Sequence, residues 1–194
     1  MVHALLSIGC EAMKQYHRGD EGYTDIIVGR VSKNSPVIEL IGQIDELVAV
    51  IGIARSLLSQ HEKLKDLDNE LKKHQLYLFR IASYLARGGK HMAGCPISSE
   101  VLRDVESRIR ELSNALPRLH YLILPSGPLQ VTLINFARTI CRRVERYASR
   151  LLHSGYIEKA VYVYLNRLSD LLYLYMRYAM HLLGVVEACL GYEA

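Results

Sequence analysis

The stretch Ala137-Arg138-Thr139-Ile140-Cys141-Arg142-Arg143-Val144-Glu145-Arg146 has the pattern of a helix that is apolar on one side and charged on the other. At about 100° per residue, Arg138, Arg142, Glu145 and Ser149 share an arc of roughly 60°, and Arg146 lies at its edge. The opposite side is apolar and consists of Leu133, Ala137, Ile140, Val144, Ala148 and Leu151. The pattern predicts a helix that buries this side and presents the charged arc.

All positive charge on the arc comes from arginine, whose planar guanidinium suits phosphate and carboxylate groups. Two interpretations remain open from the stretch alone. The arc is either an ion-pair face, exposed or between helices, or a binding site for an anion.

Composition limits the class of protein. A chain of 194 residues fits one domain with a substantial core. Its net charge of +4, without a run of Lys and Arg, favours local anion binding over a nucleic-acid surface. Four widely spaced cysteines without a CxxC pair are typical of free thiols in a reducing cytoplasm; they are Cys10, Cys95, Cys141 and Cys189.

Neither export nor membrane insertion is indicated. The N-terminus has no basic segment followed by a long apolar run. The most apolar stretch, near the C-terminus, is interrupted by Arg177, His181 and Glu187. The sequence therefore predicts a cytoplasmic protein without nucleic-acid or membrane partners.

Helical periodicity begins after residue 36 and predicts five helices, with no convincing strands. Their expected ranges are about 38–60, 64–87, 98–115, 127–153 and 157–190. Ser98 or Ser99 is expected to cap the third helix, and glycine or proline follows several of the helices. Short connections between helices indicate an all-α, five-helix up-and-down bundle. Residues 1–194 then form one domain, in which a glycine-containing loop segment, 1–36, precedes the bundle, 37–194.

Two further features bear on function. Residues 1–36 are rich in glycine and charge, which indicates either a loop whose backbone approaches a ligand or a frayed terminus. The last helix is apolar on most sides, as expected of a central or interface helix. Its one polar strip could meet the arginine arc across a cleft and consists of Lys159, Tyr162, Asn166, Asp170, Tyr173 and Arg177.

Four blocks in a fixed order resemble the PduO-type ATP:cob(I)alamin adenosyltransferases over nearly the whole chain. The first is Gly19-Asp20-Glu21-Gly22-Tyr23-Thr24 with Gly29-Arg30-Val31-Ser32-Lys33, and the second is Gly42-Gln43-Ile44-Asp45-Glu46-Leu47. The third joins Leu124-Pro125-Ser126-Gly127 to the stretch Ala137–Arg146, and the fourth is Leu165-Asn166-Arg167-Leu168-Ser169-Asp170.

This resemblance implies a homotrimeric bundle that holds ATP, Mg²⁺ and a corrinoid at subunit boundaries. The implied reaction moves the 5′-deoxyadenosyl group of ATP onto the cobalt of cob(I)alamin and releases triphosphate. A reductase that supplies cobalt(I) and an adenosylcobalamin-dependent enzyme would be partners. Because cobalt(I) is itself a nucleophile, the protein needs to align the substrates and stabilise the leaving group rather than activate a side chain.

The resemblance also implies residue roles. The loop residues Gly19, Asp20, Gly22, Thr24 and Lys33 would contact ATP. Arg142 would bind phosphate, and Arg146, at the edge of the same arc, is a further candidate for cofactor binding. Glu145 and Asn166 would lie around the nucleotide and its magnesium, with Glu145 as the metal ligand. Arg142, Glu145 and Asn166 form the expected catalytic set, and Asp45 and Arg138 the expected salt bridge between subunits.

Some positions depart from the family pattern. Leu122 stands where the family commonly has a phenylalanine that displaces the lower cobalt ligand, so Tyr121 and Leu122 are candidate corrinoid contacts. Other departures are His17-Arg18, Val48 and Pro128. They motivate an alternative, a non-catalytic ATP or corrinoid carrier on the same fold. A ferritin-like metal bundle would need inward Glu and Glu-x-x-His pairs, which the sequence lacks.

Overall fold

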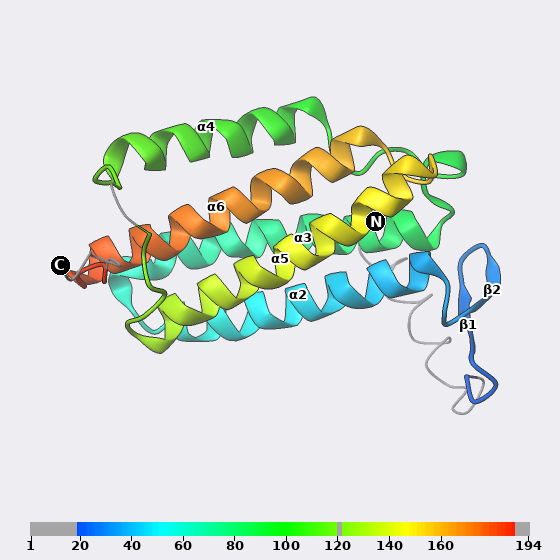
Figure 1. The fold of residues 1–194 in the computed structure, drawn as a ribbon, viewed down its shortest axis with the longest axis horizontal. Coiled ribbons are helices and arrows are strands. Elements are labelled where there is room, and N and C mark those ends of the chain that lie inside the picture. Colours follow the sequence, from blue (N-terminus) through cyan, green and yellow to red (C-terminus); the bar gives the residue numbers. More distant parts are fainter. Residues whose placement is uncertain (1–18, 120–121, 189–194) are drawn as a thin grey trace.

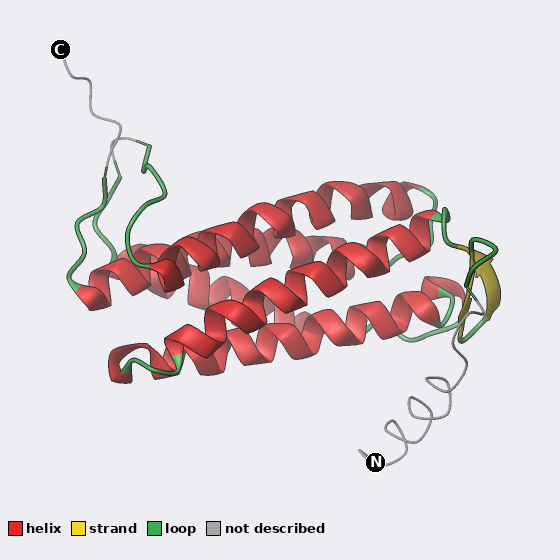
Figure 2. Cartoon of the chain, turned by 90° about the horizontal axis from the view of Figure 1, so that it is seen from below, coloured by secondary structure: helices red, strands yellow, loops and turns green. Residues whose placement is uncertain are grey.

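The computed structural model describes residues 19–119 and 122–188, and within these ranges it has the expected five long helices (Figure 1). The helices run up and down along one common direction, with short connections at the two ends of the bundle (Figure 2). They are α2 (Pro36–Leu58), α3 (Lys65–Ala86), α4 (Ser99–Ala115), α5 (Leu129–His153) and α6 (Lys159–Leu183), with single 3-10 turns η1 (Glu62–Leu64) and η2 (Gly89–His91). The predicted fold class is confirmed.

The starts of two helices follow directly from local chemistry. The hydroxyl of Ser35 accepts a hydrogen bond from the Ile38 amide at 3.3 Å, and Pro36 occupies the first helical position of α2. Ser98, rather than Ser99, caps α4 by accepting from the Val101 amide at 3.2 Å.

The last helix is shorter than the periodicity predicted. It ends at Leu183 instead of about residue 190, because Gly184 adopts a left-handed conformation with φ 68°. The amide of Val185 then bonds back to the Met180 carbonyl at 2.9 Å. The chain turns there, so residues 184–188 form a tail beside the bundle instead of a further helical turn.

The N-terminal segment contains two short strands that the sequence reading missed. Strands β1 (Tyr23–Ile26) and β2 (Gly29–Ser32) pair antiparallel, with Tyr23 opposite Ser32 and Ile26 opposite Gly29. Strands of four residues are too short to show a clear alternating pattern, which explains the miss. The hairpin stands beyond the end of the bundle at which α2 begins (Figure 1).

The core lies between the apolar sides of the helices. Helix α5 packs against both α6 and α2, α3 packs against α2, and α4 packs on α6. Ala137, Ile140, Val144, Ala148 and Leu151 are buried as predicted, and Leu133 is half-buried. Helix α6 is central, because it contacts α5, α4 and α3 and buries Tyr164 and Tyr175 in full.

No described helix combines the length and the apolar character needed to cross a bilayer. The division into a loop segment and a bundle within one domain remains a prediction.

Candidate functional site

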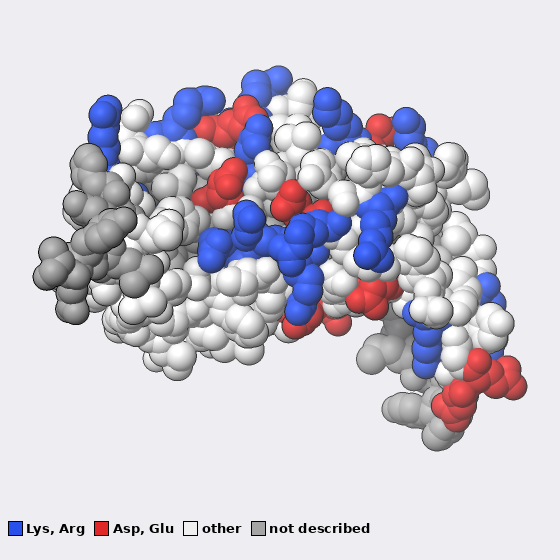
Figure 3. Space-filling view, in the orientation of Figure 1, with Lys and Arg blue, Asp and Glu red and all other residues white. Residues whose placement is uncertain are grey.

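The exposed face of α5 carries a row of arginines, and Lys and Arg side chains gather on this face of the molecule (Figure 3). Arg142 and Arg146 are exposed, one helical turn apart. Within the described parts of the chain, neither side chain has a hydrogen bond or an ion pair. An ion-pair face would show such partners, so the row has the character of an anion site.

Arg138 extends this row toward α6. Its Nε donates to the Asn135 Oδ1 at 2.9 Å, and its guanidinium lies 5.9 Å from the centre of the Tyr173 ring. Partial burial and the charge of Arg142 lower the pKa of Arg138. No carboxylate among the described residues forms an ion pair with Arg138, so within residues 19–119 and 122–188 this half-buried cation has no paired counter-charge.

A polar cluster joins α5 to α6 beside the arginines. Glu145 Oε1 accepts hydrogen bonds from the Tyr162 hydroxyl at 2.9 Å and from the Asn166 Nδ2 at 3.4 Å. The bond to Glu145, followed by burial, raises the pKa of Tyr162, so this tyrosine remains a neutral donor. The polar strips predicted on the two helices therefore meet at Glu145, Tyr162 and Asn166.

Two residues of this cluster were not expected. Arg167 donates from Nη1 to the Asn166 Oδ1 at 2.8 Å, and its Nε reaches the Glu106 Oε1 of α4 at 3.3 Å. Arg167 follows Asn166 in the block Leu165–Asp170, so the sequence could have indicated that it belongs to the site. The sequence contains no such indication for Glu106, because it is one of several charged residues on α4.

The predicted strip on α6 is not continuous. Arg177 is only 5% exposed and bonds to Glu187 and to the Pro117 carbonyl, which lie at the far end of α6 from Glu145. Arg177 therefore does not belong to the polar cluster around Glu145. It lies on the helix face that the periodicity predicted, but it is buried and its carboxylate partner comes from the tail after Gly184.

The glycine loop is closed around Lys33. The Lys33 Nζ donates to the Gly19 carbonyl at 2.8 Å, and the Lys33 amide donates to the Gly22 carbonyl at 2.8 Å. A Cβ atom on Gly19 would lie 2.7 Å from the Lys33 Nζ, so any larger residue there would displace the flexible end of Lys33. Asp20 is exposed, and Thr24 is half-buried in β1.

The loop and the arginine row of one chain lie apart. The hairpin stands beyond the end of the bundle at which α2 begins and α5 ends (Figure 1). Arg142 lies before the last residue of α5 by a length of helix of about 16 Å, and so away from the hairpin. Asp45 is exposed on α2, and it forms no ion pair with Arg138 among the residues described for this chain. Of the predicted site, the structure brings together Arg138, Arg142, Glu145, Arg146 and Asn166.

The structure describes one of the two candidate corrinoid residues. Tyr121 is outside the described residues. Leu122 follows on the connection between α4 and α5 and is 77% exposed.

The side chains present fit a magnesium ion only with help from a ligand. No group of three or more His, Cys, Asp or Glu side chains able to hold a metal occurs in the described ranges. Mg²⁺ bound with nucleotides is commonly held by one or two carboxylates together with phosphate oxygens. Glu145, beside the arginine row, meets that requirement.

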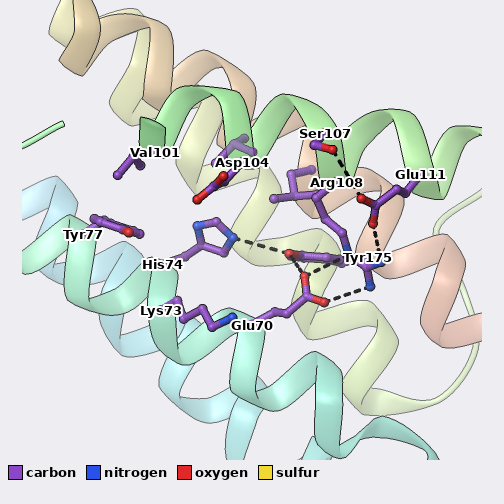
Figure 4. A pocket seen from close by; sticks show the side chains of 12 residues that line it. Glu70, Lys73, His74, Tyr77, Val101, Asp104, Ser107, Arg108, Glu111 and Tyr175 are labelled. Carbon is purple, nitrogen blue, oxygen red and sulfur yellow. Dashed lines mark hydrogen bonds and ion pairs between the residues drawn. The ribbon is translucent and has the colours of Figure 1, made fainter. Parts of the chain in front are cut away.

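A separate cavity of about 410 Å³ opens between α3, α4 and α6 (Figure 4). His74 and Tyr175 line it, together with the Glu70–Arg108 ion pair of 2.8 Å. Burial, followed by the charge of Lys73, lowers the pKa of His74 to about 4, so the imidazole is neutral near pH 7. None of the predicted site residues lines this cavity.

The fold is an all-α bundle, and its candidate site is a row of arginines on one helix, a type of side chain that suits an anionic ligand. A family model described as "Cobalamin adenosyltransferase" matches residues 15–179. The chain belongs to this family.

Individual relatives agree with that assignment. A corrinoid adenosyltransferase of Bacillus subtilis is 38% identical over 159 residues, which cover 81% of this chain and 82% of the relative. The corrinoid adenosyltransferase MMAB of Bos taurus is 35% identical over 166 residues, covering 82% of this chain and 68% of the relative. A solved variant of the PduO-type ATP:corrinoid adenosyltransferase from Lactobacillus reuteri, complexed with cobalamin and ATP, has a TM-score of 0.83 at 29% identity, covering 93% of this chain and 99% of that one.

Proposed function

We propose that this protein is an ATP:corrinoid adenosyltransferase, which transfers the 5′-deoxyadenosyl group of ATP to the cobalt of cob(I)alamin. The products are adenosylcobalamin and triphosphate. The observation that carries the proposal is the row formed by Arg142 and Arg146, without ion-pair partners among the described residues, beside the Glu145–Asn166 cluster. The related Lactobacillus reuteri protein has been solved with both cobalamin and ATP.

The chemistry suits a site without an activated side chain. The cobalt(I) electron pair attacks the ribose 5′ carbon, a cobalt–carbon bond forms, and the carbon–oxygen bond to triphosphate breaks. Cobalt is formally oxidised to cobalt(III), and the electrons of the broken bond leave with triphosphate. Cys141 is not a competing nucleophile, because burial raises the pKa of its thiol.

Each group of residues in the candidate site would have its own role in binding ATP and stabilising the leaving group. Arg142 and Arg146 would bind the phosphates and stabilise the charge that develops on the leaving triphosphate. Asn166 would position the nucleotide beside Glu145. The loop residues Gly19, Asp20, Gly22, Thr24 and Lys33 would close over ATP, with backbone amides and the Lys33 ammonium facing the phosphates.

Magnesium would be held by Glu145 together with phosphate oxygens. When bound, the ion would neutralise part of the triphosphate charge. Tyr162 and Asn166 would orient the Glu145 carboxylate through the hydrogen bonds that they donate to it.

A homotrimer would complete the site. The loop of one chain lies away from its own arginine row, and Arg138 lacks a carboxylate partner within the described part of its chain, so a neighbouring subunit could supply the loop and Asp45. Ile53 on α2 and Phe136 on α5 are 53% and 51% exposed, which provides apolar surface for such a contact.

Tyr121 and Leu122 remain our candidates for the corrinoid contact. We further propose a cytoplasmic location, a reductase that supplies cobalt(I) and an adenosylcobalamin-dependent enzyme that receives the product. The widely spaced cysteines support the compartment, and Cys95 and Cys141 are free thiols.

A single-turnover assay tests the proposal. Purified protein with ATP, Mg²⁺ and chemically reduced cobalamin should lose the cobalt(I) absorbance and yield a light-sensitive alkylcobalamin. Omission of ATP is the control. The alternative function, a non-catalytic carrier, predicts tight binding of ATP or corrinoid without transfer. Turnover above the protein-free control excludes that alternative, and its absence would overturn our proposal.

A further inference from the structure

The far end of α6 holds a buried cation that the proposed reaction does not use. Arg177 is only 5% exposed. Its Nε and Nη2 contact the Glu187 Oε1 and Oε2 at 2.7 and 3.1 Å, and Nη2 also donates to the Pro117 carbonyl at 2.8 Å. Burying a charged side chain is costly unless it is paired in this way, so the arginine fixes whichever segments satisfy it.

These bonds join three segments at one end of the bundle. Glu187 belongs to the tail after Gly184, and Pro117 belongs to the connection between α4 and α5. The tail and the connection also touch directly, because the Leu124 amide donates to the Ala188 carbonyl at 2.7 Å. Arg177 therefore ties the tail and the connection to α6.

Both segments present apolar side chains to solvent. Leu122 and Leu124 on the connection are 77% and 51% exposed, and Val186 on the tail is 87% exposed. Exposed apolar side chains on two neighbouring segments are a candidate binding surface. A corrin ring is broad and carries many methyl groups, so it matches such a surface better than a nucleotide does.

We propose that the Arg177–Glu187 ion pair positions this apolar surface for the corrinoid. The inference rests on the proposed function, in which Leu122 contacts the corrinoid. Arg177 is a positioning residue, since it is buried and acts through the backbone at Pro117 and the tail that carries Val186. Loss of the ion pair would leave the arginine row unchanged, so the defect would appear in corrinoid binding and spare ATP.

Equilibrium dialysis of cob(II)alamin in the presence of ATP, together with separate KM values for ATP and cob(I)alamin, tests the inference. Glu187→Gln removes the carboxylate charge from the tail and leaves an amide of similar size beside Arg177. The double replacement R177M and E187M exchanges the ion pair for apolar side chains of similar size, which keeps the end of α6 packed. Each variant should weaken corrinoid binding by about tenfold or more, with the KM for ATP changed by less than about twofold.

A matched control is the Arg55–Asp68 ion pair of 2.7 Å, which joins α2 to α3 away from the tail. Arg55→Met should lower thermal stability without a selective loss of corrinoid binding. Unchanged corrinoid binding in both Glu187→Gln and the double variant would overturn the inference. An equal rise in both KM values, tracking a fall in Tm, would also overturn it, because a merely structural role predicts that result.

The two proposals fail differently. Unmodified protein that binds cob(II)alamin without transferring adenosyl refutes the proposed function and leaves the positioning role open to the dialysis result. Protein that turns over equally with and without the ion pair refutes only the positioning role. Unmodified protein that neither binds nor turns over refutes both.

Discussion

Arg143 forms an ion pair with Glu46 and so fastens α5 to α2. Arg142, its neighbour in the chain, lies about 100° around the helix and has no such partner among the described residues. One arginine of the stretch is therefore part of the scaffold, and the next is available to a ligand. The two side chains form a matched pair for testing the phosphate role.

Arg142→Ala should lower kcat/KM by about 100- to 1,000-fold, as expected when a group that stabilises developing charge is removed. The decay of cobalt(I) absorbance at saturating and limiting ATP measures this change. Arg143→Ala is the control. It should change kcat/KM by less than about threefold, since an exposed ion pair contributes roughly 0–1 kcal/mol. Near-normal kinetics of Arg142→Ala would show that the phosphates bind elsewhere.

Tyr162→Phe should weaken the hold on the nucleotide and its metal. The substitution removes a hydrogen bond to Glu145, which is typically worth about 0.5–1.5 kcal/mol, so the Mg²⁺ concentration for half-maximal rate should rise roughly 2- to 10-fold. A Mg²⁺ titration at fixed ATP measures the shift. Tyr147→Phe on α5 is the control, because no hydrogen bond is formed by its hydroxyl with the described residues and its ring still faces Arg150. An identical Mg²⁺ response of both variants would contradict the role of Glu145.

Arg167→Met should slow transfer through Asn166. Arg167 holds the Asn166 Oδ1, which turns the Nδ2 toward Glu145. We expect a loss of about 10-fold in kcat/KM, and a double-mutant cycle with Asn166→Ala should show that most of this loss disappears once the amide is gone. Arg108→Met is the control, since Arg108 also ties α4 to a neighbouring helix but contacts Glu70 instead. Full additivity in the cycle would mean that Arg167 does not act through Asn166.

The helical part of the fold was predictable because each helix repeats its apolar residues over several turns. The same periodicity placed Arg142 and Glu145 on one arc. It left open whether the polar strip of the last helix meets that arc, and the hydrogen bond between Glu145 and Asn166 shows that it does. Periodicity failed at Gly184, because a single left-handed residue ends a helix whose apolar pattern continues beyond it.

Features that depend on long-range partners could not be predicted. Glu106 is one charge among many on α4 until the fold places it beside Arg167. The sequence pattern places Arg177 on the same helix face as Asn166. Its ion-pair partner, Glu187, lies in the tail after the turn at Gly184, which the pattern does not indicate. The hairpin at Tyr23–Ile26 and Gly29–Ser32 is set by four paired residues, which is too little sequence for an alternating signal.

Gly19→Ala should damage nucleotide binding through Lys33. The added Cβ would lie 2.7 Å from the Lys33 Nζ, so the ammonium must move away from the Gly19 carbonyl. We expect the KM for ATP to rise roughly 5- to 20-fold with little change in Tm, given the strength of charge-assisted bonds. Gly94→Ala is the control, because a Cβ there meets nothing within 4 Å. An unchanged KM in Gly19→Ala would separate Lys33 from the phosphates.

The stability of the protein should fall as pH falls from about 6.5 toward 4 because of His74. Its folded-state pKa of about 4 lies below the ordinary value of 6.5, so the unfolded chain binds an extra proton in this interval. The contribution is complete above pH 6.5 and is lost toward pH 4. Its loss should lower the free energy of unfolding by roughly 2–3 kcal/mol between pH 7.5 and pH 4.5.

The neutral imidazole is fixed by its neighbours. Tyr175 donates its proton to Glu70, so its oxygen accepts from the His74 Nε2 at 3.4 Å, and the Nδ1 accepts from Tyr164 at 3.0 Å. Protonating His74 would place an Nδ1–H donor opposite the O–H donor of Tyr164, with Lys73 nearby (Figure 4). His74→Gln should therefore be less stable than the unmodified protein at pH 7.5 but show a shallower decline toward pH 4.5.

Urea denaturation at a series of pH values and one protein concentration measures this effect. His181→Gln is the control, because His181 is exposed and does not line this cavity. Equal slopes for His74→Gln and the unmodified protein would contradict the assignment, since the acid sensitivity would then arise from the carboxylates. A smaller slope in His74→Gln alone would locate the acid sensitivity in the cavity between α3, α4 and α6, away from the arginine row.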